Sequence, residues 1–364
     1  MPEPQPLRGE PRFTALGGRD DAPAGAVRLD LNTAPAESPG YRERLAAALA
    51  EVDLAAYGQE RALPLRRALA GWSGIDAERI FVAGGSMAVL EALLSAYAAP
   101  GGSAVSFDPG YAGCERLCEA LGIDLRRAER GPDFALDPER VDRALSGVAP
   151  PNAVLFCHPG NPTGRAELPE TVERACELLP GSLVIVDEAY VDFTAAGSMA
   201  HLLERHRNLV LVRTFSKAWA LAGARLGYAL ASPEIVAELA ARQLPGAVSA
   251  LTQAAGIAAL AEPEADRRER IGAICRERDR IAAALDSLPG VETWPSSANF
   301  VLFRCPGDAS EVLEACAGAG LLIREMGARP GLEDCLRVTV GEPPANDRFL
   351  AAVASTRQRA GVAE

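Results

Sequence analysis

One lysine is the residue in this sequence with the clearest chemical meaning. The chain has 364 residues and 37 basic side chains, and every basic residue other than Lys217 is an arginine. Arginine can replace lysine as a surface charge, but its pKa above ~12 prevents it from attacking a carbonyl. An amine can be tuned by burial from a pKa of ~10.4, and it can form a Schiff base. Lys217 is therefore a candidate for covalent chemistry. The alternative is a surface lysine that has been retained by chance.

The neighbours of this lysine favour a phosphate. Lys217 follows an apolar stretch, Leu209–Val212, that is typical of a strand, and it is flanked by Thr214 and Ser216. Arg225 comes eight residues later. Hydroxyls donate hydrogen bonds to phosphate oxygens, and the guanidinium fork matches them. An amine beside such groups indicates a phosphorylated aldehyde cofactor held as an imine, although Arg225 could instead form a surface ion pair.

A glycine-rich turn provides a second possible phosphate contact. Gly84, Gly85 and Ser86 follow the predicted strand Ile80–Ala83 and open an apolar helix. Glycines let backbone N–H groups approach an anion, and a helix N-terminus favours negative charge. Glycines at a strand–helix junction often form only a turn, so this signal gains weight from Lys217 and Arg225.

Two further strand ends carry polar side chains suited to an aromatic cofactor. The strand Leu183–Val186 runs into Asp187, with Tyr190 three residues on. A carboxylate there could pair with the protonated pyridine nitrogen of pyridoxal phosphate, which drains electrons from a substrate carbanion. Tyr190 could donate to the cofactor's phenolate oxygen, and the rigid turn around Asn161 could hold its amide toward the same oxygen. Ordinary loop capping is the alternative for either motif.

Short apolar stretches alternate with helical patterns over the first two thirds of the chain. This alternation predicts a three-layer α/β/α domain with a mainly parallel sheet, which binds ligands at the carboxyl ends of its strands. A long charged helical pattern at 262–281, followed by further strands, predicts a smaller α+β domain. The expected division is an N-terminal arm at 1–40, a large cofactor-binding domain at 41–259 and a small C-terminal domain at 260–364.

The composition excludes several other classes. A net charge of −12 argues against binding nucleic acid through a basic surface. No apolar stretch reaches the roughly 18 residues of a membrane span, and the first residues lack the apolar region of a secretory signal. The eight cysteines form no CxxC pair, and Cys114 and Cys118 have no nearby His or Cys partner. We therefore expect a cytoplasmic protein with reduced thiols and no metal site.

Three motifs in order resemble the fold-type-I aminotransferases of class I and II. They are Asn161-Pro-Thr-Gly164, Asp187-Glu-Ala-Tyr190 and Thr214-Phe-Ser-Lys217 with Arg225. Further stretches, such as Ala298-Asn-Phe-Val-Leu302 and Cys335-Leu-Arg-Val-Thr-Val-Gly341, make the histidinol-phosphate aminotransferases the most similar group. The similarity runs from about residue 28 to the end of the chain.

By position, this resemblance implies a role for each motif residue around pyridoxal phosphate. Lys217 is expected to form the imine and to move a proton between the substrate Cα and the cofactor C4′. Asp187 is expected to hold N1, Asn161 and Tyr190 to hold O3′, and Tyr111 to stack on the pyridine ring. The expected phosphate ligands are Ser86, the Met87 backbone, Thr214, Ser216 and Arg225.

The resemblance also implies substrate contacts and a second subunit. Tyr57 is expected to reach the phosphate from a partner subunit, which implies a homodimer with shared active sites. Arg337 is expected to grip the amino acid's carboxylate beside Asn161, and Arg324 lies where the family binds a phosphorylated side chain. A surface charge is the alternative for Arg324.

The expected reaction is amino transfer to a 2-oxo acid, with histidinol phosphate and 2-oxoglutarate as the first substrate pair. An aromatic or specialised-metabolism aminotransferase shares most of these features. A lyase similar to threonine-phosphate decarboxylase would use the same lysine, and would release carbon dioxide without needing a 2-oxo acid. A cofactor-binding protein without turnover is a third class, which no residue favours.

Overall fold

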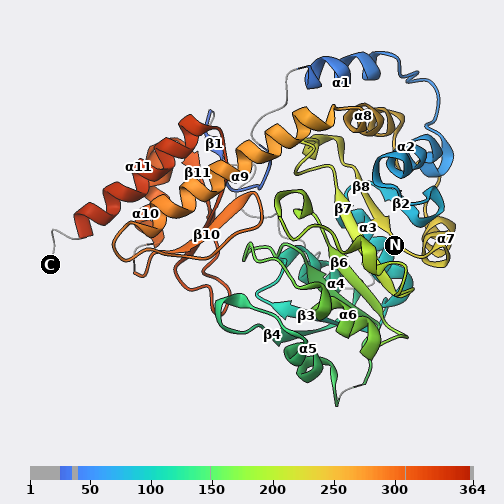
Figure 1. The fold of residues 1–364 in the computed structure, drawn as a ribbon, viewed down its shortest axis with the longest axis horizontal. Helices are drawn as coiled ribbons and strands as arrows, with labels where there is room; N and C mark the ends of the chain where they lie inside the picture. Colours follow the sequence, from blue (N-terminus) through green and yellow to red (C-terminus); the bar gives the residue numbers. More distant parts are fainter. Residues whose placement is uncertain (1–24, 35–39, 148, 308, 361–364) are drawn as a thin grey trace, which may run out of the picture.

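A mixed sheet of seven strands forms the centre of the larger part of the molecule. The computed structural model describes residues 25–34, 40–147, 149–307 and 309–360. The strand order is β2-β8-β7-β6-β5-β3-β4, and only β8 runs antiparallel to its neighbours (Figure 1). The strands are β2 Ile80–Ala83, β3 Ser103–Asp108, β4 Asp124–Glu129, β5 Ala153–Cys157, β6 Leu183–Asp187, β7 Leu209–Thr214 and β8 Gly227–Leu230.

Helices cover both faces of this sheet, which confirms the predicted three layers. Strand residues alternate between two apolar clusters: Val184 and Val186 face one layer, whereas Leu183 and Ile185 face the other. The first layer contains α1 Tyr41–Ala50, α2 Leu63–Ser73, α5 Pro138–Leu145, α6 Pro169–Leu178 and α8 Ala250–Leu260. The second contains α3 Ser86–Tyr97, α4 Ala112–Leu121 and α7 Pro233–Arg242.

A smaller α+β part follows the long helix α9, Glu264–Asp286, which runs from α8 across to the second sheet (Figure 1). Four antiparallel strands form that sheet in the order β12-β13-β10-β9. It has its own apolar core, packed against α9, α10 and α11. The elements are β9 Glu292–Thr293, β10 Phe300–Arg304, α10 Ala309–Gly318, β12 Arg324–Glu325, β13 Cys335–Thr339 and α11 Pro343–Ala360.

The described end of the predicted N-terminal arm packs on this smaller part. Strand β1, Val27–Arg28, pairs in parallel with β11, Leu321–Leu322. Leu29 is buried in the apolar core of the smaller part, and its carbonyl accepts a 2.7 Å hydrogen bond from the Thr339 N–H. Residues 27–34 are therefore structurally a part of the C-terminal unit, while residues 1–24 of the arm lie outside the described residues.

Two strands of the main sheet, β4 and β8, escaped the sequence analysis. Strand β4 has the polar sequence Asp-Leu-Arg-Arg-Ala-Glu because it is the outermost strand and largely accessible to solvent. Strand β8 is short and reversed, inserted between β2 and β7, and no local pattern distinguishes a reversed strand from a parallel one.

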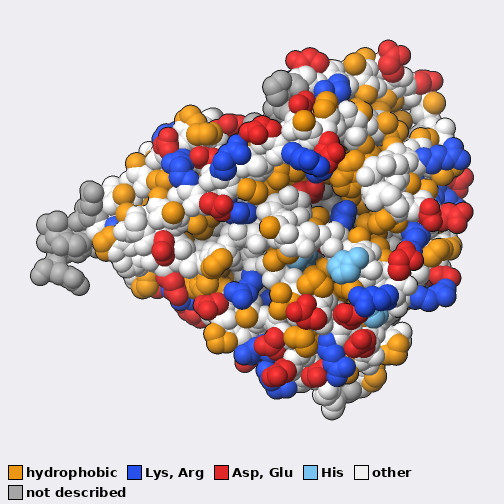
Figure 2. All heavy atoms as spheres, in the orientation of Figure 1, with side chains coloured by type: hydrophobic (Ala, Val, Ile, Leu, Met, Phe, Trp, Pro, Cys, Tyr) orange, Lys and Arg blue, Asp and Glu red, His pale blue; other side chains and the backbone are white. Residues whose placement is uncertain are grey.

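Acidic and basic side chains are interspersed over the face in Figure 2, without a large area of one sign. Within the described ranges, no helix combines the length and the apolar character needed to cross a bilayer.

The packing of the N-terminal segment can be tested with one core substitution. We expect Leu29→Ala to lower the free energy of unfolding by about 2–5 kcal/mol, because the side chain is only 2% exposed and its removal leaves a cavity. Leu168→Ala is the control, since Leu168 is 50% exposed and should lose less than about 1 kcal/mol. Chemical denaturation measures both values, and equal losses would show that residues 27–34 contribute no more than a surface contact.

Candidate active site

A cavity of about 540 Å³ lies at the carboxyl ends of the parallel strands, between the two parts of the chain. It gathers every predicted site residue except Tyr57. Residues from the main sheet and its loops form one wall, and β12, β13 and the N-terminal segment form the other. The predicted residues that line it are Ser86, Met87, Tyr111, Asn161, Asp187, Tyr190, Thr214, Ser216, Lys217, Arg225, Arg324 and Arg337.

The turn between β2 and α3 is held against Arg225 by two glycines. Gly85 has a φ of 102°, a conformation that only glycine adopts without strain, and a Cβ there would collide with the Arg225 guanidinium. A Cβ at Gly227 would collide with the backbone of Gly85 and Ser86. Because neither glycine has a side chain, the N-terminus of α3 and the Arg225 guanidinium can lie close together.

Two hydroxyls complete this cluster, which we call the anion cradle (Gly85, Ser86, Thr214, Ser216 and Arg225). The hydroxyl oxygens of Thr214 and Ser216 are 3.0 Å apart, and the Ser216 N–H donates to the Thr214 hydroxyl over 3.1 Å. Arg225 Nη1 donates to the Ser216 hydroxyl over 3.5 Å. Backbone N–H groups, hydroxyls and a cation in one concave site fit a phosphate.

Asp187 is a buried carboxylate at the end of β6. Burial raises its pKa to about 6, although the Ala189 N–H, at 3.0 Å, and the Lys217 ammonium both favour the ionised form. Lys217 Nζ donates to the Leu31 carbonyl over 3.0 Å and lies 5.6 Å from the centre of the Tyr190 ring. A carboxylate that is costly to ionise gains most from a bound cation, which fits a protonated pyridine nitrogen.

Asn161 connects the Tyr190 hydroxyl with Arg337. Its amide nitrogen donates to the Tyr190 hydroxyl over 3.1 Å, and its amide oxygen accepts from Arg337 Nη1 over 2.6 Å. Burial raises the pKa of Tyr190 above its ordinary value, so the phenol remains protonated at neutral pH. The two residues that were predicted to reach one cofactor oxygen are therefore adjacent.

Tyr111 precedes helix α4 at the cavity wall. Burial raises its pKa to about 12, so it too remains a neutral phenol. A Cβ at Gly113 would lie 2.5 Å from Tyr111 Cε1, so the ring packs against the first turn of α4.

Arg324 and Arg337 lie opposite each other in the register of β12 and β13, so their side chains share one face of the sheet. Arg337 is buried, its Nη2 donates to the Asp30 carbonyl over 2.9 Å, and its Nε has no hydrogen-bond partner among the described residues. A buried guanidinium with an unused donor fits an anionic ligand.

Three cavity residues were missed by the sequence analysis. Asn32 donates to the Tyr190 hydroxyl over 3.0 Å, and Asp30 supplies the carbonyl for Arg337. Arg329 forms an ion pair with Glu115 and donates to the Gly110 carbonyl, so it links the smaller part to α4. The N-terminal segment and the loop after β12 carry no periodic pattern, so only their long-range contacts reveal them.

Tyr57 lies elsewhere, on the loop between α1 and α2. Its side chain is 98% exposed, and Leu244, 79% exposed, is on the connection between α7 and α8.

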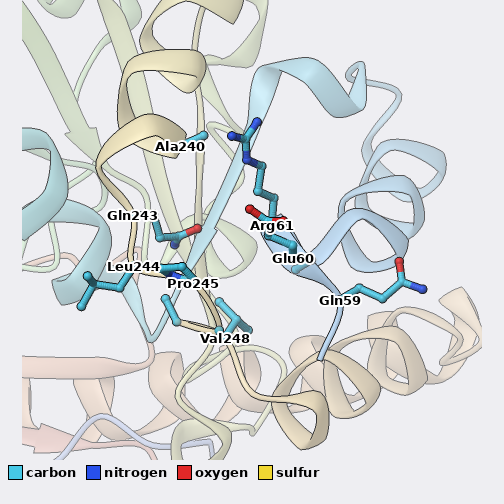
Figure 3. Close-up of a pocket in the computed structure, with 11 residues that line it drawn as sticks. Gln59, Glu60, Arg61, Ala240, Gln243, Leu244, Pro245 and Val248 are labelled. Carbon is cyan, nitrogen blue, oxygen red and sulfur yellow. The ribbon is translucent and has the colours of Figure 1, made fainter. Parts of the chain in front are cut away.

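Figure 3 shows the segments Gln59–Arg61 and Gln243–Val248 side by side around a pocket of about 20 Å³. That volume is about the size of one water molecule, so the pocket is too small for a substrate.

No metal is implied by the geometry. Over the described ranges, no three His, Cys, Asp or Glu side chains are grouped so that they could hold an ion. Lys217, the buried carboxylate of Asp187 and the anion cradle line one cavity at the carboxyl edge of the sheet. This arrangement fits the class of enzymes that use a phosphorylated aldehyde cofactor.

Comparison with known proteins gives the family. The model for aminotransferase class I and II matches residues 26–353. Histidinol-phosphate aminotransferases from Frankia casuarinae and Stenotrophomonas maltophilia are 38% and 34% identical to the chain. The alignments cover 91% and 96% of this chain, and 85% and 96% of the relatives. The chain therefore belongs to the class I and II aminotransferases and uses pyridoxal phosphate.

Solved structures agree with this assignment. Histidinol-phosphate aminotransferase from Sinorhizobium meliloti, in complex with pyridoxal-5'-phosphate, superposes with a TM-score of 0.82 and 26% identity, over 92% of this chain and 91% of that one. L-threonine-O-3-phosphate decarboxylase from Porphyromonas gingivalis gives 0.77 and 26%, over 91% and 99%. The predicted fold and cofactor are confirmed.

The burial of Asp187 predicts a pH-dependent effect in the cofactor-free chain. A carboxyl whose pKa rises on folding from 3.8 to about 6 contributes most stability below pH 3.8 and loses it as the pH rises through 6. Asp187→Asn should therefore stabilise the cofactor-free chain by up to about 3 kcal/mol near neutral pH and by nothing near pH 4. Unfolding at both pH values measures the difference, and a pH-independent effect would contradict this account.

The glycine contacts predict a selective loss of cofactor binding. Gly227→Ala should weaken pyridoxal-phosphate binding by about tenfold or more, because the new Cβ displaces the turn by more than a hydrogen bond tolerates. Gly223→Ala is a matched control, since a Cβ there meets nothing within 4 Å. Absorbance titration with the cofactor gives both affinities, and equal affinities would show that this turn does not bind the phosphate.

Proposed function

We propose that this enzyme is a histidinol-phosphate aminotransferase that passes the amino group to 2-oxoglutarate. The observation that carries this proposal is 34–38% identity to relatives of that name over at least nine tenths of the chain. A cavity with two neighbouring arginines, Arg324 and Arg337, supports it, because both proposed substrates carry anionic groups.

The residues of the main sheet hold the cofactor in this proposal. The anion cradle, with the Met87 backbone, binds the phosphate; Asp187 holds N1; and Asn161 and Tyr190 hold O3′. Tyr111 covers the ring. When bound, pyridoxal phosphate draws electrons away from the substrate Cα, which makes its proton removable.

Lys217 moves that proton. Its amine lines the cavity and is held from two sides, by the Leu31 carbonyl at 3.0 Å and by the face of the Tyr190 ring. A neutral amine accepts the proton from the substrate Cα as a general base and, once protonated, delivers it to the cofactor C4′ as a general acid. Arginine at this position would keep its proton and could do neither.

Arg337 binds the carboxylate of the oxo acid, and Arg324 binds the phosphate of the donor. The unused Nε of Arg337 offers one hydrogen bond to the carboxylate while its bonds to Asn161 and Asp30 stay in place. Asn161 completes the carboxylate site, since its amide touches Arg337.

We also propose a cytoplasmic homodimer with the domain division 41–259 and 260–364. Tyr57 contributes to the partner's cofactor site. Its 98% exposure, with 77% for Leu54 and 79% for Leu244, supports a face that is covered in the assembly. The eight cysteines are free, as expected for a reducing compartment.

A single-turnover screen tests this function. Purified enzyme with bound cofactor is mixed with histidinol phosphate or with glutamate, and the absorbance change to the amine form is followed. We expect both compounds to convert the bound cofactor to its amine form, and 2-oxoglutarate to convert it back. Release of carbon dioxide from threonine phosphate, without any requirement for a 2-oxo acid, would instead support the decarboxylase and overturn the proposal.

The role of Arg324 gives a separate prediction. Arg324→Gln should lower kcat/KM for histidinol phosphate about 10- to 100-fold, the effect of one lost charged hydrogen bond, while cofactor uptake is retained. Arg207→Gln is the control, because Arg207 is exposed and pairs with Glu234 at the surface. Steady-state kinetics with both variants decide it, and an unchanged kcat/KM for Arg324→Gln would remove this residue from the substrate site.

A further inference from the structure

The Tyr190 hydroxyl receives two amide donors in the cavity. Asn161 Nδ2 lies 3.1 Å from the hydroxyl oxygen, and Asn32 Nδ2 lies 3.0 Å from it. Asn32 belongs to the N-terminal segment, 158 residues away in the sequence, and both asparagines are buried. A phenolic oxygen with two donors has no room for a third.

The contacts of Arg337 fix the direction of the Asn161 amide. A guanidinium only donates hydrogen bonds, so the atom at 2.6 Å from Arg337 Nη1 must be the amide oxygen. The amide nitrogen of Asn161 therefore faces Tyr190.

The Thr339 hydroxyl holds the oxygen end of the Asn32 amide. The Thr339 hydroxyl accepts the Asn32 backbone N–H over 2.9 Å and donates to Asn32 Oδ1 over 3.2 Å. Asn299 Nδ2 also donates to the Asn32 carbonyl, over 3.2 Å. The Asn32 side chain is thus held by the smaller part of the chain, with its NH₂ group toward Tyr190.

The backbone at this position favours asparagine as well. Asn32 has a φ of 53°, in the left-handed region. Asparagine and glycine enter this region at low cost, whereas most side chains do not. One residue type therefore satisfies both the turn and the donor.

We propose that Asn32 is a positioning residue for Tyr190: together with Asn161 it occupies the acceptor sites of the phenol, so that the hydroxyl proton points into the cavity, toward the cofactor oxygen. This inference rests on the proposed cofactor site. It makes the N-terminal segment, through Thr339 and Asn299, a part of the machinery that sets the proton position.

Several other groups surround the same hydroxyl and must be considered in any pH measurement. Arg337 favours the ionised phenol, whereas Tyr111 and Cys157 disfavour it, and Lys217 lies over the Tyr190 ring. None of them donates to the hydroxyl among the contacts that the structure describes, so the two amides alone direct its proton.

The test compares variants in which one uncharged side chain replaces another. The absorbance of bound pyridoxal phosphate is titrated against pH, a measurement that does not depend on turnover. Asn32→Gly keeps the backbone conformation and removes the donor. Its titration midpoint should move by about 0.5–1 pH unit, the effect of one hydrogen bond, in the same direction as that of Tyr190→Phe. In the Tyr190→Phe background, Asn32→Gly should cause no further shift.

A second variant and a control keep the outcome decisive. Thr339→Val removes the hydroxyl that holds the Asn32 amide, and it should shift the midpoint in the same direction. This variant provides the test if Asn32→Gly does not fold. Asn208→Gly removes a side chain that bonds to backbone carbonyls away from the cavity, and should leave the midpoint unchanged.

The possible failures are distinguishable. A wild-type enzyme that takes up no pyridoxal phosphate would overturn the proposed site itself. A wild type that binds it, with Asn32→Gly and Thr339→Val titrating like the wild type, would overturn only the role of Asn32. An equal shift from Asn32→Gly with and without the Tyr190 hydroxyl would also contradict it, because the effect would then not pass through that group.

Discussion

Parallel pairing of three neighbouring strands is the constraint on which this site depends. In the register of β5 and β6, Cys157 lies opposite Asp187, and in that of β6 and β7, Asp187 lies opposite Val212. The three strands therefore end at nearly the same level. Their next residues, which include Asn161, Tyr190 and Lys217, enter one cavity although they are far apart in the sequence.

The same cavity concentrates groups that are costly to bury. Asp187 resists ionisation, and Arg337 keeps one donor without a partner. Such groups are retained where a ligand of opposite charge completes them. The smaller part and the N-terminal segment close the opposite wall with Asn32, Arg324 and Arg337. The proposed cofactor site and the proposed substrate site therefore belong to different units of the chain.

The sequence predicted much of this arrangement because its signals are local. Apolar stretches located β2, β6 and β7 to within two residues, and polar residues that follow them line the cavity as expected. The hypothesis of covalent chemistry at Lys217 came from composition, because it is the one lysine in the sequence. Asn32 could not be assigned in this way, since its role depends on a hydrogen bond to a residue 158 positions away. Strand β8 was missed because its four residues are too short a pattern to distinguish from a loop. Arg329 was missed because its partner Glu115 lies in a distant helix.

The central claim is a covalent link between Lys217 and the cofactor, and borohydride reduction tests it most directly. Reduction fixes the imine, and mass spectrometry of the digested protein then locates the pyridoxyl group. Because Lys217 is the one lysine in the 364 residues, the assignment has no competing lysine. The account predicts a pyridoxyl adduct on the peptide that contains Lys217. A reduced holoenzyme with that peptide unmodified would contradict it.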